Sequence, residues 1–367
     1  MNRRELMASV TGMAGLATMG TAFSRAALAQ DIDALVEASK AEGRMTIYSN
    51  WGEEFWPYIL DPFKEKYPWT EFDYLDLGGN EILERYLIET SAGAKSGDFL
   101  QPTAAVTVED LYGRNQFIDF QVTDHDVLPS IAKSRPGVYA NALDAEVMGW
   151  NKRLLPPELV PTGLEDMANK VAANPDVFDG KIVGYPPHTV ASRNLIFHLL
   201  ELHHGPQFWD WMDVIAPKMK FLEGSSAMVE GIMSGTYLLC LAMPLSTCLM
   251  TMRDPARASL YDWGFHHDGQ AVGGRFAGIP VATTTPNTSR LLLDYMMTKE
   301  GQAANTFAGK LSVRSDLPPE TMAEDAVTLN DIEQAVGPEN IVVVDYKADL
   351  EEGMAVFRER FKKALQA

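Results

Sequence analysis

Residues 45–55 read MTIYSNWGEEF, and they join an apolar, strand-like segment to the polar opening of a helix. A helical pattern over residues 31–42 precedes this stretch, and another follows it over residues 51–67. The alternation continues with strands expected over residues 72–77 and 99–100 and a helix over residues 81–91. Alternating strands and helices are typical of a sheet built by right-handed crossovers. The first 140 residues therefore predict an α/β domain.

A second alternation begins after residues 138–150, a long extended segment rich in small residues. Strands are expected over residues 181–185, 218–222 and 238–243, and helices over residues 190–203 and 226–234. Another extended segment, residues 275–283, precedes a helical pattern over residues 288–307. Because the two extended segments bracket this alternation, the chain is expected to enter a second lobe and later to leave it. The expected lobes are residues 30–140 with 278–314, and residues 141–277 with 315–367.

The first 29 residues predict an export signal rather than a part of the globule. Arg3 and Arg4 precede an uncharged run, and Ala27-Leu28-Ala29 has the A-x-A form of a cleavage site. The arginine pair indicates the twin-arginine type of signal, whose cargo crosses the membrane folded. An ordinary secretory signal or an uncleaved anchor is the alternative, and whether cleavage occurs stays open. The expected location is the periplasm.

Composition and motifs exclude several classes of function. A formal net charge of −19 over 367 residues repels nucleic acid and anionic lipid, so neither is an expected partner. The sequence has no G-x-S-x-G, H-E-x-x-H, C-x-x-C or P-loop motif, so we expect neither an enzyme nor a metal or cofactor site. Cys240 and Cys248 are expected to be buried thiols, although export would allow them to form a disulfide.

Five segments in register give the chain a family resemblance. They are LVEASKAEGRMTIYS (35–49), DPFKEKYP (61–68), GNEILERYLIETSAGAKSGDFL (79–100), DAEVMGWNKRLLP (144–156) and IPVATTTPNTSRLLLDYMMTKEGQAA (279–304). Together they resemble periplasmic solute-binding proteins of ABC transporters, in the type 2 group that includes ferric-iron, polyamine, thiamine and phosphonate binders. The resemblance implies a monomer with two α/β lobes, two crossing hinge strands and a central ligand cleft, which delivers a solute to the permease subunits of the inner membrane.

One departure from the iron-binding branch concerns its ligands. In that branch adjacent tyrosines supply phenolate ligands from a segment that corresponds here to residues 240–246, CLAMPLS. The sequence has no tyrosine pair there, which puts ferric-iron binding in doubt.

The helix starts that face the expected cleft are candidate ligand sites, because unpaired backbone N–H groups attract anions. At the first start, Ser49, Asn50 and Trp51 are candidates, but Asn50 and Glu53 have the spacing of a capping box and acids there repel an anion. Trp51 would then offer its ring face to an ammonium or apolar group. The alternative is that the junction only caps the helix, with Trp51 in the core.

The second lobe has two helix starts without an acid in the first turn. Candidates at the first are His188, Thr189 as a cap, Ser192 as a hydroxyl donor and Arg193 as a fixed cation suited to phosphonate, phosphate or carboxylate. The alternative for Arg193 is a solvated face and an acidic partner. At the second start, Ser225 can cap the helix, or Ser225 and Ser226 can contact an anion, and the two roles are compatible.

Three further candidates follow strands: Gln101 and Thr103 after the short strand, and Trp150 after the first crossing segment, for which a core position is the alternative. The sequence therefore predicts a binder of a small polar organic solute with an anionic group, zwitterions included. Its anionic end is expected in the second lobe, and its neutral or cationic end near Trp51 and Glu53. The alternatives left open are a polyamine binder, a ferric-iron binder, a secreted enzyme on the same scaffold, or a binding module for a sensor.

Overall fold

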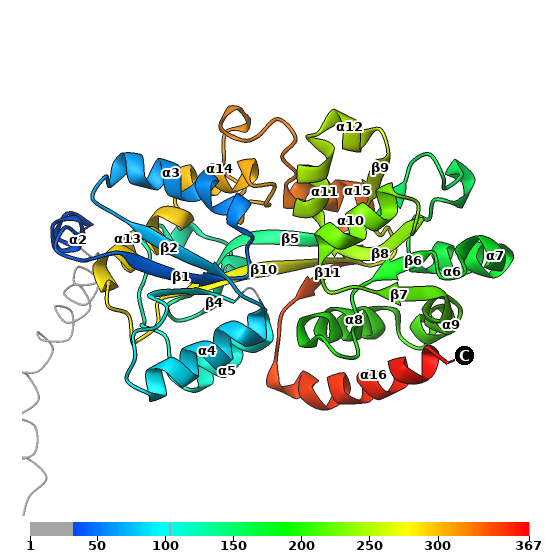
Figure 1. Cartoon of the computed structure of the whole chain (residues 1–367), viewed down its shortest axis with the longest axis horizontal. Coiled ribbons are helices and arrows are strands. Elements are labelled where there is room, and N and C mark those ends of the chain that lie inside the picture. The colour runs from blue at the N-terminus through cyan, green and yellow to red at the C-terminus, as the bar shows by residue number, and fades with distance from the viewer. Residues whose placement is uncertain (1–31, 103, 367) are drawn as a thin grey trace, which may run out of the picture.

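The computed structural model describes residues 32–102 and 104–366, which fold into two α/β lobes that lie side by side (Figure 1). The expected export signal, residues 1–29, lies outside the described residues. No helix within the described part of the chain is long and apolar enough to cross a bilayer.

The lobe on the left of Figure 1 is built on three parallel strands, with β1 (Met45–Ser49) between β2 (Phe72–Asp76) and β3 (Phe99–Gln101). Its helices are α2 (Ile32–Ser39), α3 (Trp56–Lys66), α4 (Gly79–Ser91), α5 (Ala105–Gly113), α13 (Pro286–Met297) and α14 (Lys299–Phe307). Helices α13 and α14 come from late in the chain and pack against α2 and α3. The lobe is thus completed by a returning segment.

The other lobe contains β6 (Ile182–Gly184), β7 (Met219–Phe221), β8 (Leu239–Pro244) and β9 (Tyr261–Gly264). Strand β6 pairs in parallel with β7 and β8. The longer helices of this part of the chain are α6 (Leu164–Ala173), α8 (Ala191–His204), α9 (Gln207–Ile215), α10 (Ser225–Met233), α11 (Leu245–Met252), α15 (Leu329–Val336) and α16 (Glu351–Ala364). Short α7 (Pro175–Phe178) and α12 (Pro255–Ala258) complete the set shown in Figure 1.

Two long strands cross between the lobes, as the resemblance implies. The first part of β5 (Val138–Asn151) pairs antiparallel with β10 (Gln270–Gly278), and its last part pairs with β8 and β9. Short β4 (Lys133–Arg135) pairs with β5, and β11 (Ile341–Val344) pairs with β10. The main strand order is β2-β1-β3-β10-β5-β8-β6-β7, so one continuous sheet runs through both lobes. The expected fold class is confirmed.

Two expected helices are each divided in two. The helix expected over residues 51–67 begins as a 3-10 turn, Glu53–Phe55, before α3, and Gly52 rather than Asn50 is the N-cap residue. The predicted capping box of Asn50 and Glu53 is therefore wrong. The helix expected over residues 288–307 breaks at Thr298, whose hydroxyl accepts a hydrogen bond from the Gly301 N–H and starts α14. Gly301 permits the break, because a Cβ there would overlap the Tyr295 carbonyl.

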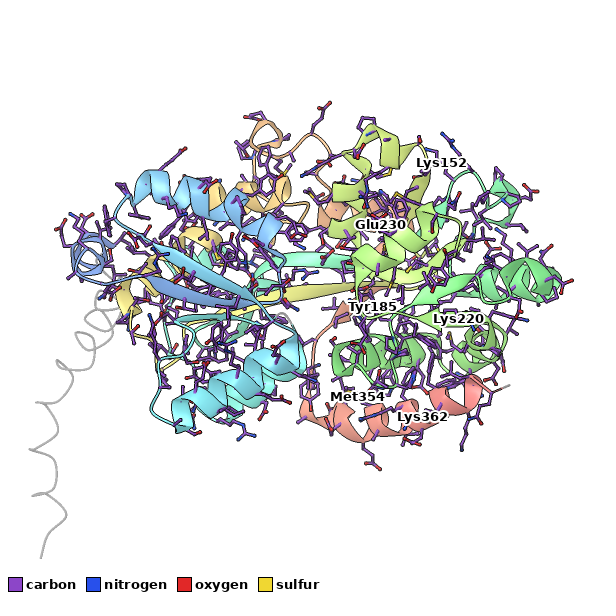
Figure 2. All side chains as sticks on the ribbon, viewed as in Figure 1. Lys152, Tyr185, Lys220, Glu230, Met354 and Lys362 are labelled. Carbon is purple, nitrogen blue, oxygen red and sulfur yellow. The ribbon has the colours of Figure 1, made fainter. Side chains whose placement is uncertain are left out.

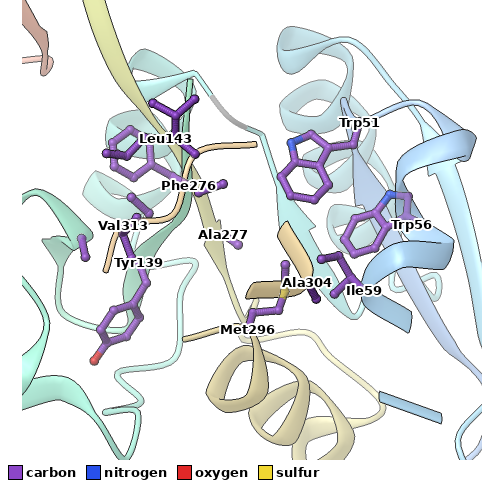
Figure 3. Close-up of a cluster of buried hydrophobic side chains, with 14 of the residues drawn as sticks. Trp51, Trp56, Ile59, Tyr139, Leu143, Phe276, Ala277, Met296, Ala304 and Val313 are labelled. Carbon is purple, nitrogen blue, oxygen red and sulfur yellow. The ribbon is translucent and has the colours of Figure 1, made fainter. Parts of the chain in front are cut away.

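The start of α3 is fixed by two buried indoles. Trp51 and Trp56 lie side by side with ring centres 5.5 Å apart, and Figure 3 shows them beside Ile59 and Met296. Both tryptophans are at most 1% exposed. Burial of a large apolar side chain stabilises a fold by about 1.5–3 kcal/mol, so this cluster holds the loop of residues 50–55 against the lobe.

Candidate functional site

A cavity of about 640 Å³ lies between the two lobes. One wall comes from the loop after β1 and the end of β2, and the other from the starts of α8, α10 and α11. A smaller chamber of about 110 Å³ adjoins it and shares the lining residues Asn50, Ser192, Arg193 and Arg275. We call the two spaces the larger chamber and the smaller chamber.

Asp144, on crossing strand β5, organises one group of buried charges. Its Oδ2 accepts hydrogen bonds from Arg275 Nε at 2.9 Å and Nη2 at 2.5 Å, and from the Ser246 hydroxyl at 2.7 Å. Lys310 Nζ lies 3.6 Å from the same oxygen and donates to Ser246 Oγ at 2.7 Å. Burial by itself raises the pKa of Asp144, but the nearby charges of Arg275 and Lys310 outweigh it and hold this pKa below its ordinary value.

Lys310 is a buried cation enclosed partly by aromatic rings. Its Nζ lies 4.4 Å from the ring centre of Phe55 and 5.3 Å from that of Trp51, and the residue is 3% exposed. Burial, with the charge of Arg275 as a second cause, lowers the pKa of Lys310 from 10.5 to about 7 despite the opposing effect of Asp144. The positive charge of the Lys310 ammonium is therefore only partly balanced by Asp144, and an added anion would favour the protonated form of the lysine.

Arg193 and Glu146 form the second buried pair. Arg193 Nη1 lies 2.5 Å from Glu146 Oε1, and the guanidinium stacks over the Tyr185 ring at 3.9 Å from its centre. Burial alone would lower the pKa of Arg193, but the Glu146 carboxylate raises it above its ordinary value. Tyr185 lies on the inner side of its lobe (Figure 2), and burial raises the pKa of its phenol. Arg193 is thus a fixed cation beside a neutral phenol.

We call these five residues, Asp144, Glu146, Arg193, Arg275 and Lys310, the cavity base. When Lys310 is protonated, the base carries three positive charges against two negative ones.

Four more charged residues line the larger chamber, and we call them the cavity mouth: exposed Glu54, Asp76 and Glu223, and half-buried Arg257. Arg257 pairs with Glu230 at 2.7 Å. Partial burial, with the charge of Glu54 as a second cause, raises the pKa of Asp76. Ser225 and Thr247 also line the larger chamber, and Ser225 Oγ is 3.0 Å from Thr247 Oγ1.

Six of the twelve residues expected to bind the ligand line the cavity: Asn50, Trp51, Ser192, Arg193, Ser225 and Ser226. Two of their predicted roles are corrected by their contacts. The N-cap residue of α10 is Gly224, so Ser225 bonds to Thr247 instead of capping the helix. The ring of Trp51 already faces the ammonium of Lys310, so it does not offer that face to a ligand cation.

Five other expected residues lie away from the cavity lining, and three of them are Ser49, Gln101 and Trp150. Ser49 accepts from the Trp51 N–H at 2.9 Å and donates to Gln101 Oε1 at 2.6 Å, so both residues support the loop from behind. Trp150 packs into the core beside Gly264. Thr103 falls outside the described residues.

Two expected ligand residues before α8 also lie outside the lining. His188 stacks on Phe361 with ring centres 5.8 Å apart and meets Phe221 edge-on. The N-cap residue of α8 is Val190, so the predicted cap by Thr189 is wrong, and its hydroxyl lies 3.5 Å from the Pro186 carbonyl instead.

Sequence reasoning missed four of the five residues of the cavity base. Asp144 and Glu146 are the two charged residues of β5 and stand two apart, so they share one face of the sheet, and this spacing was a usable signal. Arg275 occupies the other crossing strand and is paired in register with Ala142, next to them. Lys310 follows α14 in a short segment with no local pattern, and only the tertiary fold brings it to the cavity.

The architecture defines a class of fold. Two α/β lobes joined by crossing strands, with a polar cavity between them, make up the fold of the type 2 periplasmic binding proteins.

Solved structures agree with this assignment. The substrate-binding protein of an ABC transporter from Agrobacterium tumefaciens matches with a TM-score of 0.77 at 20% identity, over 88% of this chain and 96% of that one. Iron-bound HitA from Pseudomonas aeruginosa matches with a TM-score of 0.69 at 12% identity, over 88% and 99% of the two chains. A ferric binding protein from Campylobacter jejuni gives 0.63 at 13% identity, over 88% and 97%.

At these identities the likeness shows the fold. No protein-family model matches the sequence, and no curated protein matches it.

Proposed function

We propose that this protein is an extracytoplasmic solute-binding component of an ABC transporter that captures a small polar organic solute with an anionic group. The observation that carries the proposal is the excess positive charge of the cavity base, where Arg193, Arg275 and Lys310 meet two carboxylates. In a buried site such charges are weakly screened, so a carboxylate, phosphate or phosphonate would gain strong charge-assisted hydrogen bonds.

Hydroxyl groups of the larger chamber support the same assignment. Ser192, Ser225, Ser226 and Thr247 line it and can donate to the oxygens of an anion. A few aimed polar groups in a closed cavity are the usual basis of ligand specificity, and the crossing strands allow hinge closure around the solute. The bound form would then be presented to a membrane permease.

Two alternatives fit the cavity base less well. A polyamine would meet three cations at the base, although the acidic mouth would attract it. Ferric iron prefers oxygen ligands that carry charge, yet burial raises the pKa of the Tyr185 phenol and so disfavours the phenolate. Among residues 32–102 and 104–366, no group of three His, Cys, Asp or Glu side chains is placed to hold a metal ion.

A thermal-shift screen of the protein without its first 29 residues tests the proposal. The screen compares carboxylates, phosphates and phosphonates with putrescine, spermidine and ferric citrate. A ligand at 100 times its dissociation constant stabilises the fold by about 2.7 kcal/mol, which is a readable shift. Stabilisation by one of the anions supports the proposal. A shift with polyamines or iron alone would refute it, and turnover of the bound compound on prolonged incubation would indicate an enzyme.

A further inference from the structure

The smaller chamber is built differently from the larger one. It is bounded by apolar side chains, namely Ala104, Ala105, Leu195, Ile196, Phe276 and Val344, and by the polar groups of Asn50, Asp144, Glu146, Ser192, Arg193 and Arg275. Its volume is about 110 Å³, against about 640 Å³ for the larger chamber. The smaller chamber is therefore suited to a small end group of a solute.

Two buried acceptor atoms of residues that line this chamber have no partner among the described residues. Glu146 Oε1 pairs with Arg193 at 2.5 Å, but Glu146 Oε2 has no hydrogen-bond partner. Asn50 Oδ1 is likewise buried and unpaired. Both atoms are acceptors, and leaving a buried acceptor unsatisfied is unfavourable, above all when it carries charge. A donor group of a ligand placed in this chamber could satisfy both atoms.

Other places for a ligand cation are weaker candidates. The Trp51 ring faces Lys310, so that surface is taken by a cation of the protein itself. Glu54 and Asp76 at the mouth are exposed, so water satisfies their oxygens without any ligand. Among the described carboxylates that line the two chambers, Glu146 combines a largely buried side chain, at 12% exposure, with an oxygen that has no hydrogen-bond partner.

We infer that the smaller chamber binds a primary ammonium group of the solute, which donates to Glu146 Oε2 and Asn50 Oδ1. The inference rests on the proposed function and narrows its substrate class to short zwitterions. Arg193 and Arg275 line both chambers, so an anionic group in the larger chamber and an ammonium in the smaller one can lie on either side of them. The cationic end of the solute thus points inward, away from Trp51 and the mouth.

Matched ligand pairs test this inference by isothermal titration calorimetry. The pairs are β-alanine with propionate, and 2-aminoethylphosphonate with ethylphosphonate; each pair differs by one ammonium group. For the wild-type protein we expect at least tenfold tighter binding of the amino compound in a pair that binds. In E146Q the amide oxygen can still accept a hydrogen bond from Arg193. The preference for the amino compound should fall below about threefold in this variant, and the affinity of the compound without nitrogen should change less than threefold.

Two more variants locate the effect. E54Q removes an acid at the mouth and should leave the preference for the amino compound unchanged. N50D adds a carboxylate at the smaller chamber and should increase that preference, and it serves as the test if E146Q does not fold. The inference is overturned if the wild-type protein binds both members of a pair equally, or if E146Q weakens both to the same extent. Binding of none of the four compounds, together with binding of putrescine or ferric citrate, would instead refute the proposed function itself.

Discussion

The base and the mouth of the cavity carry opposite charges in opposite surroundings. At the base, Asp144 and Arg275 are 7% and 13% exposed, whereas at the mouth Arg257 and its partner Glu230 are 36% and 61% exposed. Salt and water screen the exposed charges, but they screen the buried ones much less. The acidic mouth and the net charge of −19 are therefore weak indicators of the charge of the ligand. The cationic base is the stronger indicator.

The largest difference between the two regions should appear in stability. Asp144→Asn leaves Arg275 and Lys310 buried without their shared carboxylate. Breaking a buried ion pair by removing one partner costs about 3–5 kcal/mol, whereas an exposed pair contributes about 1 kcal/mol or less. Urea unfolding of D144N should show the larger loss of stability. The matched control is Glu230→Gln, which breaks the exposed pair with Arg257 and should show the smaller loss. Equal losses in the two variants would mean that the base is not a distinct electrostatic environment.

Lys310→Met should have the largest effect on binding. Methionine retains the contact with Phe55 and Trp51 but removes the excess positive charge. A hydrogen bond to a charged group contributes about 1.5–3 kcal/mol, so anion affinity should fall roughly 10- to 150-fold in calorimetric titrations. Lys299→Met removes an exposed charge and is the control, with no expected change. Unchanged affinity in K310M would exclude Lys310 from the anion site.

A smaller effect concerns pH. Because the pKa of Lys310 is lowered to about 7, the lysine of the ligand-free protein loses its proton as the pH rises above 7. An anion raises this pKa again, so binding takes up a proton above pH 7, and the affinity of a carboxylate ligand should fall roughly three- to tenfold between pH 7 and 8.5. Titrations in two buffers of different ionisation enthalpy measure the proton uptake directly. K310M should show no uptake, and a wild-type protein that also shows none would disprove the lowered pKa.

The mouth should contribute the smallest effect, and mainly to rates. Replacing Glu54 by Gln and Asp76 by Asn removes two exposed acids that repel an approaching anion. The association rate constant in stopped-flow measurements should rise about two- to fivefold at low salt, and the gain should vanish near 0.5 M salt. Asp179→Asn, an exposed acid outside the cavity lining, is the control. A gain that persists at high salt would place these acids in direct contact with the ligand.

The elements of the fold were largely predictable, because periodicity and turn residues act locally. Strand β1, helix α4 and crossing strand β5 occur where the sequence patterns predicted them. The break at Thr298 was missed, since it depends on the close approach of Gly301 to the preceding helix.

The candidate site was much less predictable. The residues of the cavity base come from four separate segments, β5, α8, β10 and the stretch after α14, and pair only in the folded chain. Arg193 was selected from its helix start, but its partner Glu146 was not, because no local spacing links the two. Helix-start reasoning also overestimated side-chain capping: Asn50, Thr189 and Ser225 do not cap the helices that they precede or begin.

A crystal structure with a bound anionic solute tests the central claim most directly. We predict that the anionic group lies in the larger chamber, with an oxygen within about 3 Å of Lys310 Nζ or of a guanidinium nitrogen of Arg193 or Arg275. A solute whose anionic group lies at the mouth, or a bound cation or metal ion in place of an anion, would contradict the account.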